Sequence, residues 1–359
     1  MASSTNLMVL MHCLRYTFTN STASFGRLLI LLVALCLLAG SAAHAQTVGN
    51  FQTLNDPSGT HGGTYATGIS GGNIVGSYNG SHNINHGFLY NGTAFTTLDD
   101  PSASNATGRG TYASGISGGN IVGYYILSTN VYNGFLYDGS SYTTLTDPSA
   151  AATSGNGTLA ADIDGGNIVG RYSDSAGIQY GFLYNGSSYT TLTDPSAATT
   201  AGNGTFAIGI SGDVIVGGFT DSTGLEHGFI YNGTSYTTLN DPLGFNGTEA
   251  DGISDGYIVG TYVDSSGIAH GFLYTGSSFI NFDDPSAVKG TIAAGIDGSN
   301  IVGFYLDSGD ISHGFTATIT PVPESAAWPL LAGALGLAFA ACHRRSTPKK
   351  TRPASASLC

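Results

Sequence analysis

The stretch GTFAIGISGDVIVGGFTDSTGLEHGFIYNGTSYTTLNDP, Gly204–Pro242, decides the fold because the chain repeats it, with variations, almost six times. Its Ile-Val-Gly triplet recurs at intervals of 47, 47, 47, 43 and 43 residues, and its Gly-Phe pair follows the same intervals. Self-similarity with a period near 45 residues marks a repeat architecture. The triplets begin at Ile74, Ile121, Ile168, Ile215, Ile258 and Ile301.

Each repeat contains four short stretches that are typical of β-strands. In the second copy these are residues 112–116, 121–125, 135–137 and 142–145, which are rich in β-branched and aromatic residues. Asp138-Gly139 separates the last two, and Asx-Gly between two such runs predicts a hairpin. No copy sustains a helical period, and Gly clusters and Asp-Pro pairs interrupt every quarter of the repeat. The repeat region is therefore predicted to be all-β.

The length of the repeat selects the architecture. Four antiparallel strands in about 47 residues match one blade of a β-propeller, whereas solenoid coils and leucine-rich repeats need about half that length. The first three strand types occur six times, but the sixth repeat, which ends at Ile319, has no fourth strand. A matching segment, Phe51–Leu54, precedes the first repeat instead. We therefore predict a six-bladed β-propeller over residues 46–320, closed by the N-terminal strand.

The charge of the repeat region is strongly acidic. Between residues 47 and 320 the cations are Arg109, Arg171 and Lys289, against 22 acidic residues, which gives a net charge of −19. Nucleic acid is excluded as a partner because phosphate binding needs clustered cations.

Both ends of the chain carry membrane-targeting patterns. Residues 28–40 form an apolar run that follows Arg27 and precedes Ala43-His44-Ala45, so residues 1–45 are predicted to be a signal peptide. An uncleaved anchor helix is the alternative. Near the other end, residues 326–342 form an apolar stretch that is followed by Arg344 and Arg345, which predicts a short transmembrane helix with the repeats outside. Residues 346–359 are predicted to be a disordered tail.

The C-terminal pattern resembles the PEP-CTERM sorting signal of Gram-negative bacteria, which combines a Val-Pro-Glu-Pro motif, a short helix and an arginine cluster. Val322, Pro323 and Glu324 match the motif, Ser325 departs from it, and Arg344 and Arg345 match the cluster. The resemblance implies an exosortase-type processing enzyme as a partner that acts on residues 321–345.

The repeats resemble the HAF-type extracellular repeat. His-Gly-Phe-Ile-Tyr at residues 227–231 is similar to its His-Ala-Phe-Leu-aromatic pattern, and Gly-Ile-Ser-Asp-Gly-Tyr-Ile-Val-Gly at residues 252–260 is similar to its second segment. The resemblance extends over residues 51–315 and implies export and a repeat fold, and it leaves the chemistry open.

Histidines and aspartates recur at fixed positions of the repeat. His86, His227, His270 and His313 each precede Gly-Phe, and this regularity favours a structural role over ligand contact. The loops after the second strands carry aspartates, and so do the loops after the fourth strands, which a meander brings to the same face. These side chains predict either turns, in which Asx groups bond their own backbone, or a cation-binding face for Ca²⁺. The candidate ligands in the first set are Asp174, Asp221, Asp264 and Asp307.

Three functions remain open on the sequence. The favoured hypothesis is an exported, surface-associated, non-enzymatic protein that acts as a binding or matrix component linked to extracellular polysaccharide. The alternatives are a carbohydrate-active hydrolase that uses acidic loop residues, and a structural surface protein with no specific ligand. A glycosidase needs two carboxylates at a defined separation, and no pair stands out from the repeats.

Overall fold

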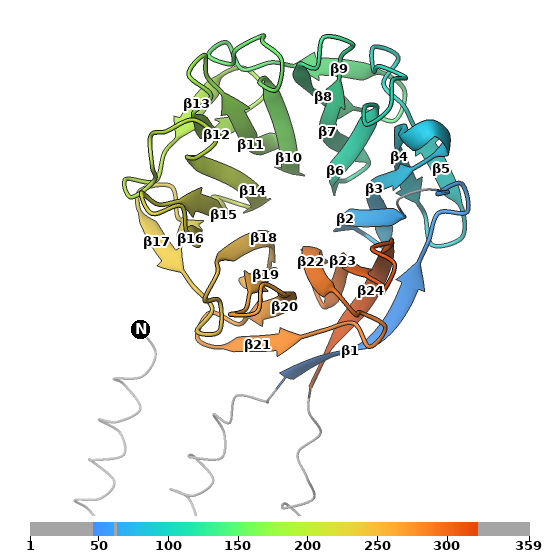
Figure 1. The fold of residues 1–359 in the computed structure, drawn as a ribbon, viewed down its shortest axis with the longest axis vertical. Helices are drawn as coiled ribbons and strands as arrows, with labels where there is room; N and C mark the ends of the chain where they lie inside the picture. The colour runs from blue at the N-terminus through green and yellow to red at the C-terminus, as the bar shows by residue number, and fades with distance from the viewer. Residues whose placement is uncertain (1–45, 61–62, 322–359) are drawn as a thin grey trace, which may run out of the picture. The chain divides into compact units, whose positions relative to one another are not determined.

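The computed structural model describes residues 46–60 and 63–321, and it has the predicted β-propeller architecture. Four-stranded antiparallel meanders follow one another around a central opening, with the first strand of each nearest the centre (Figure 1). The first meander comprises β2 (Thr64–Ser70), β3 (Asn73–Asn79), β4 (Asn85–Tyr90) and β5 (Phe95–Leu98), with the short 3-10 helix η1 (Ser81–Asn83) before β4.

The next four repeats form the same four strands. The second meander comprises β6 (Thr111–Ser117), β7 (Asn120–Ile126), β8 (Tyr132–Tyr137) and β9 (Tyr142–Leu145); the third β10 (Thr158–Asp164), β11 (Asn167–Ser173), β12 (Gln179–Tyr184) and β13 (Tyr189–Leu192); the fourth β14 (Thr205–Ser211), β15 (Val214–Thr220), β16 (Glu226–Tyr231) and β17 (Tyr236–Leu239); the fifth β18 (Thr248–Ser254), β19 (Tyr257–Val263), β20 (Ala269–Tyr274) and β21 (Phe279–Phe282).

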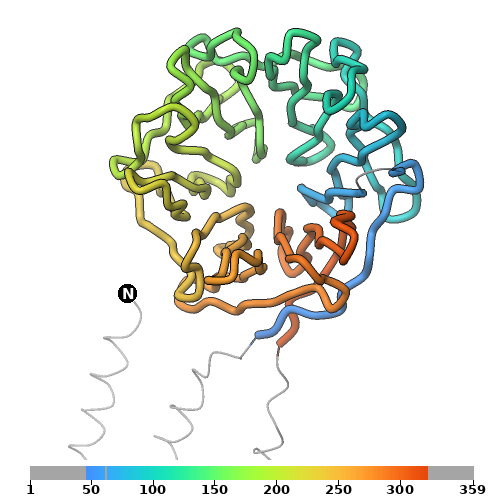
Figure 2. The backbone as a smooth tube through the Cα atoms, viewed as in Figure 1, coloured from blue at the N-terminus to red at the C-terminus, as the bar shows by residue number. Residues whose placement is uncertain are grey.

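The sixth meander is completed by the N-terminus, as the strand count predicted. Its strands are β22 (Gly290–Asp297), β23 (Asn300–Leu306) and β24 (Ser312–Pro321), and β1 (Gln46–Leu54) pairs with β24. In Figure 2 the blue and red ends of the ring lie side by side at this point. The Phe51 ring packs 5.6 Å from that of Phe315 and 6.1 Å from that of Phe282, so the joint also has an apolar core.

The predicted count of six blades is not matched by the number of hydrogen-bonded sheets. Among the described residues there are four separate four-stranded sheets and one of eight strands, which contains the fifth and sixth meanders. The two meanders are joined by one parallel bridge pair, Ala269 with Gly290, and equivalent isolated bridges join four other pairs of neighbours. The sequence did not reveal these bridges because a single backbone pair leaves no hydrophobic pattern.

The predicted hairpin turns are longer than two residues. β8 and β9 are antiparallel neighbours in which Tyr137 faces Tyr142, so four residues make the turn. The Asp138 carboxylate accepts the N–H groups of Ser140 and Ser141, each at 2.8 Å, and Gly139 alone has positive φ (93°) in this turn. The aspartate therefore builds an Asx turn rather than a tight two-residue hairpin.

The core lies between successive meanders, as expected for strands that are apolar on both faces. Each third strand buries one phenylalanine completely, which packs against the second strand of its own meander at a glycine. At Gly170 an added Cβ would lie 2.1 Å from the Leu159 carbonyl oxygen and 2.8 Å from the Phe182 ring. The glycine thus permits the close approach that buries the ring. The six phenylalanines are Phe88, Phe135, Phe182, Phe229, Phe272 and Phe315.

Residues 46–320 form one compact unit. The predicted signal peptide (1–45), the motif residues Val322, Pro323 and Glu324, the cationic pair Arg344 and Arg345, and the tail 346–359 lie outside the described residues. Within 46–60 and 63–321, no helix has the length and apolar character needed to span a bilayer.

Candidate binding sites

The predicted loop aspartates stabilise their own turns. Oδ1 of Asp221 accepts the N–H groups of Thr223 (2.7 Å) and Leu225 (3.1 Å), and Asp174, Asp264 and Asp307 make the same pair of bonds in their loops. The hydroxyl of Thr223 also donates to Asp221 and lowers the pKa of that carboxyl well below its usual range. The pKa values of Asp264 and Asp307 are also lowered, mainly by the backbone hydrogen bonds from Ile268 and Ile311.

The repeated histidines stack beside three of these aspartates. The ring of His227 lies 5.1 Å from that of Phe219, and its Nε2 lies 3.1 Å from Oδ2 of Asp221. His270 and His313 repeat the arrangement with Asp264 (3.6 Å) and Asp307 (3.4 Å). These contacts are the ones that a structural role for the histidines predicts. In the described part of the chain no group of three or more His, Cys, Asp or Glu side chains is placed to hold a metal ion, and calcium at the loops stays a prediction.

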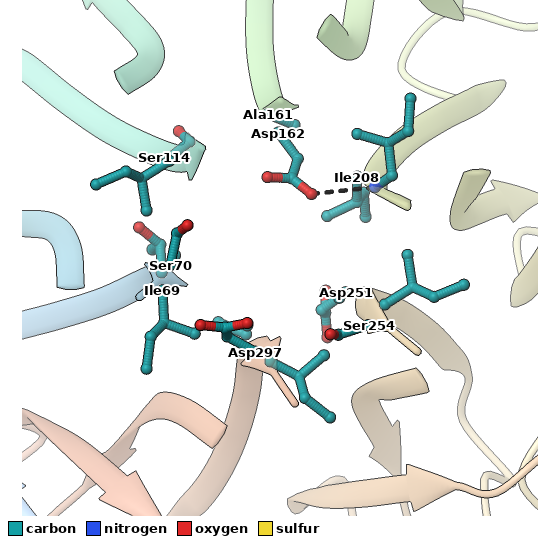
Figure 3. A pocket seen from close by; sticks show the side chains of 18 of the residues that line it. Ile69, Ser70, Ser114, Ala161, Asp162, Ile208, Asp251, Ser254 and Asp297 are labelled. Carbon is teal, nitrogen blue, oxygen red and sulfur yellow. Dashed lines mark hydrogen bonds between the residues drawn. The ribbon is translucent and has the colours of Figure 1, made fainter. Parts of the chain in front are cut away.

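The central opening of the ring contains a cavity of about 380 Å³. Residues of the first strand of every meander line it, namely β2, β6, β10, β14, β18 and β22, with isoleucines contributed by all six (Figure 3). Asp162 from β10 and Asp251 from β18 also face this channel. Two more carboxylates line the cavity, Asp164 and Asp297, at one repeat position that serine fills in the other copies, whereas Asp162 and Asp251 each stand where no other repeat has a carboxylate.

Asp162 is held by a neighbouring meander. Its Oδ2 accepts the Ile210 N–H at 3.0 Å, from β14. Burial raises the pKa of Asp162 to about 7, because the ionised form loses hydration that this hydrogen bond only partly replaces. The side chain therefore exchanges its proton close to neutral pH.

Asp251 stands at a β-bulge. The register between β18 and β19 shifts between Ala250 and Gly252, and such an extra residue redirects a side chain. Oδ2 of Asp251 accepts a hydrogen bond from the Thr261 hydroxyl at 3.1 Å. Burial, followed by the charge of Glu249, raises the pKa of Asp251 well above its ordinary value.

Two further acids form a carboxyl pair near Asp251. Burial and then the charge of Glu226 raise the pKa of Glu249 to about 8, and burial also raises the pKa of Glu226. The Glu226 carboxyl raises the pKa of Glu249 and Glu249 lowers that of Glu226, so Glu249 is the more readily protonated of the two. Arg171 favours the ionised forms of both and lies 5.6 Å from the centre of the Phe206 ring.

Sequence reasoning missed this acid group because it weighed residues that recur. The sequence signal for these acids is that they differ from the residues at the same position in the other repeats. Asp162 stands where the other five copies have glycine, and Glu249 stands where they have Tyr65, Tyr112, Leu159, Phe206 and Ile292. Together with the bulge residue Asp251, these acids can bind protons near neutral pH and attract a cation. The loop aspartates are less suited to either role because their carboxylates accept hydrogen bonds within turns.

The outer rim of the ring repeats a second arrangement. The rings of Tyr137 and Tyr142 lie 4.7 Å apart across the turn between β8 and β9, and the Tyr137 hydroxyl donates to the Gly139 carbonyl. Two exposed threonines, Thr143 and Thr144, follow in β9. The same ring pair recurs in the other repeats that have their own fourth strand, at Tyr90–Phe95, Tyr184–Tyr189, Tyr231–Tyr236 and Tyr274–Phe279.

No protein-family model matches the chain, and neither does any curated protein. Among solved structures, a mutant of the Aleuria aurantia lectin in complex with alpha-methyl-L-fucoside has 12% identity and a TM-score of 0.46, with 73% of this chain and 96% of the lectin covered. A mutant of AofleA from Arthrobotrys oligospora has 12% identity and a TM-score of 0.46, with 77% and 94% covered. A polysaccharide lyase, an ulvan lyase, has 13% identity and a TM-score of 0.36, with 74% and 80% covered.

Proposed function

We propose that this chain is an exported, surface-associated, non-enzymatic protein that binds extracellular polysaccharide. The observation that carries the proposal is the outer rim, where five repeats present a pair of aromatic rings beside hydroxyl or amide side chains. The C–H face of a sugar packs on an aromatic face, and hydroxyl and amide groups bond its hydroxyls. Several weak sites on one rigid ring add up to useful avidity for a polymer of repeated units.

The charge of the ring selects among polysaccharides. The 22 acids and three cations of residues 47–320 repel polyanions, so the proposed polymer is neutral or cationic. This charge also disfavours nucleic acid.

We count the ring as six blades, with the eight-stranded sheet as two. The four strands of each meander, with β1 completing the sixth, and the single bridge pair between β20 and β22 support this count. The patterns at the chain ends support export to the cell surface or extracellular matrix, a membrane anchor through the C-terminal helix, and processing by an exosortase-type enzyme at Pro323 and Glu324.

Affinity gel electrophoresis tests the proposed binding. The full chain in mild detergent is run through native gels that contain dextran, galactomannan or alginate, with serum albumin as the reference. We expect at least one neutral polysaccharide to retard the chain and anionic alginate to leave it unaffected. Equal mobility in all gels would reject polysaccharide binding.

A hydrolase is the second candidate, and the channel acids are what favours it. The raised pKa of Asp162 lets it hold a proton near pH 7, as a general acid requires, and Asp251 lines the same cavity. These residues replace the acidic loop residues that the sequence predicted for this activity. Release of reducing ends from the retarding polysaccharide, abolished by Asp162→Asn, would establish hydrolysis; no release would leave the binding function alone.

A further inference from the structure

A groove of about 570 Å³ lies between the outer strands of the fourth and fifth meanders. The end of β17 and the following Asp-Pro turn form one wall, and the turn into β21 with its aromatic pair forms the other. This volume falls in the range of roughly 300–1,000 Å³ that small-molecule sites occupy. The groove is lined by Asp241, Leu243, Phe279 and Asn281, among others.

Asp241 supplies a carboxylate oxygen that has no partner. The residue is only 3% exposed, and its Oδ1 accepts the Leu243 N–H at 2.8 Å and the Asn281 amide at 3.4 Å. Its Oδ2 is buried and makes no hydrogen bond, which among the six Asp-Pro turns holds also for Oδ2 of Asp147. A buried acceptor without a donor is costly, so a ligand hydroxyl that donates to this oxygen would be strongly favoured.

The same groove contains two departures from the repeat. Asn281 stands where the other fourth strands within the repeats have Thr97, Thr144, Thr191 and Thr238. Leu243 stands where the other Asp-Pro turns have serine, and it is 50% exposed. Phe245, two residues further on, is 65% exposed. Of these two side chains, Leu243 lines the groove and gives it an apolar wall that the other Asp-Pro turns lack.

We propose that this groove is the dominant sugar subsite of the ring and takes one neutral sugar unit. The apolar face of the sugar lies against Phe279 and Leu243, one hydroxyl donates to Oδ2 of Asp241, and a second bonds the Asn281 amide. A Ca²⁺ ion takes six to eight oxygen ligands, and one carboxylate beside an amide and two apolar side chains supplies too few of them. This assignment rests on the proposed polysaccharide binding and names the site within it.

Three variants of the full chain test the assignment, with the dissociation constant measured from retardation in dextran and galactomannan gels. Asp241→Asn keeps the turn and replaces the free oxygen with an amino group. Asn281→Thr restores the residue of the other repeats. Asp194→Asn is the control, since it alters the same turn where the described residues show no unpartnered buried oxygen. We expect the first two to weaken binding about tenfold or more, as for the loss of a hydrogen bond to a charged or amide group, and the control to change it less than twofold.

The outcomes separate the subsite from the function. If the wild-type chain binds and all three variants bind equally well, the subsite is wrong and polysaccharide binding stands. The subsite is also wrong if Asp194→Asn weakens binding as much as Asp241→Asn, because the effect is then on turns. If no polysaccharide retards the wild type, the proposed function fails and takes the subsite with it. Matching melting temperatures exclude unfolding as the cause of weaker binding.

Discussion

At the scale of single residues, the repeats act as an internal control, because any residue that the fold alone requires should recur. Glycine recurs in five copies at the position of Asp162, where neighbouring inner strands lie close together: a Cβ at Gly115 would be 2.6 Å from the Asp162 Cα. A carboxylate in this place is a departure that packing does not demand. Such departures are the best guide to function in a symmetric fold.

The Asp162 carboxylate should make stability depend on pH. Its pKa is about 7 in the fold and near 4 when unfolded, so its contribution to stability is fully present below pH 4 and is lost as pH rises through 7. Asp162→Asn keeps an acceptor for the Ile210 N–H and removes this loss. We expect the free energy of unfolding of the variant, relative to that of the wild type, to be about 1–3 kcal/mol higher at pH 8 than at pH 5. This range allows for water in the channel. Urea unfolding at both pH values measures the difference.

Asp164→Asn is the matched control for this experiment. Asp164 lines the same cavity and also reaches across to another meander, where its Oδ2 accepts the Gly212 N–H at 2.7 Å. The control leaves Asp162 in place and should retain the pH dependence of the wild type. An equal gain for Asp162→Asn at pH 5 and pH 8 would show that the carboxyl titrates normally.

The sequence predicted the site less well than it could have. Asp174, Asp221, Asp264 and Asp307 were chosen because they recur, and recurrence follows from their turn-forming role. Glu249 and Asn281 could have been found by asking which residues break the pattern. The unpartnered oxygen of Asp241 could not have been found in this way. Whether that oxygen has a partner depends on which meanders become neighbours and on how deeply the turn is buried.

At the scale of strands, the glycines of the second strands are expected to be among the least replaceable residues. Gly170→Ala would drive a methyl group into the Leu159 carbonyl oxygen and the Phe182 ring, neither of which is free to move. We expect a loss of about 3 kcal/mol or more. Gly49→Ala in β1, where an added Cβ meets nothing within 4 Å, should cost less than about 0.5 kcal/mol. Chemical unfolding of both variants measures this difference, and similar denaturation midpoints for the two would contradict the packing argument.

The loop aspartates give a second prediction at this scale. If Asp221, Asp264 and their equivalents bind Ca²⁺, millimolar calcium raises the melting temperature and EDTA reverses the change, because a ligand of the native state stabilises it. The Asx-turn hydrogen bonds already occupy one oxygen of each carboxylate. The turn interpretation therefore predicts a shift below 1 °C, as in a magnesium control, and a larger calcium-specific rise would establish the cation-binding interpretation instead.

Strands were the most predictable part of the molecule. Residues 142–145 were predicted as a strand and are β9, because aromatic and β-branched residues between two turns favour a strand. The number of separate sheets was not predictable in the same way. It depends on the bridge between Ala269 and Gly290, which backbone groups form without any contribution from side-chain pattern.

At the scale of the whole molecule, the two ends of the chain are proposed to set its location. The apolar stretch at 326–342 and the cations Arg344 and Arg345 predict a membrane anchor. Deleting residues 321–359 should therefore release the protein into the medium or periplasm. Pro323→Ala with Glu324→Ala should keep the anchor and block only the processing. Membrane fractionation distinguishes these outcomes, and a deletion variant that still sediments with membranes would exclude the helix as the anchor.

Closure of the ring by β1 is expected to contribute strongly to the stability of the molecule. β1 joins β24 across more than 250 residues of sequence, and Leu54, 8% exposed, belongs to the core shared with Ala66 and Phe88. Without β1 the last sheet would expose an unpaired edge and the Phe315 side of its core. Deleting residues 46–55 should therefore lower the melting temperature by at least 10 °C, since several kcal/mol of packing and pairing are lost, and should promote aggregation.

A smaller change separates closure from the mere loss of chain. Phe51→Ala keeps the strand but removes the ring that packs on Phe282 and Phe315, and should cost about 2–4 kcal/mol. Thr47→Ala, at the exposed start of the same strand, removes only a hydroxyl 3.1 Å from that of Thr320 and should be nearly neutral. If the deletion of residues 46–55 and Phe51→Ala both leave thermal unfolding and light scattering as in the wild type, the ring does not depend on its N-terminal strand. Each meander must then be held by its neighbours alone.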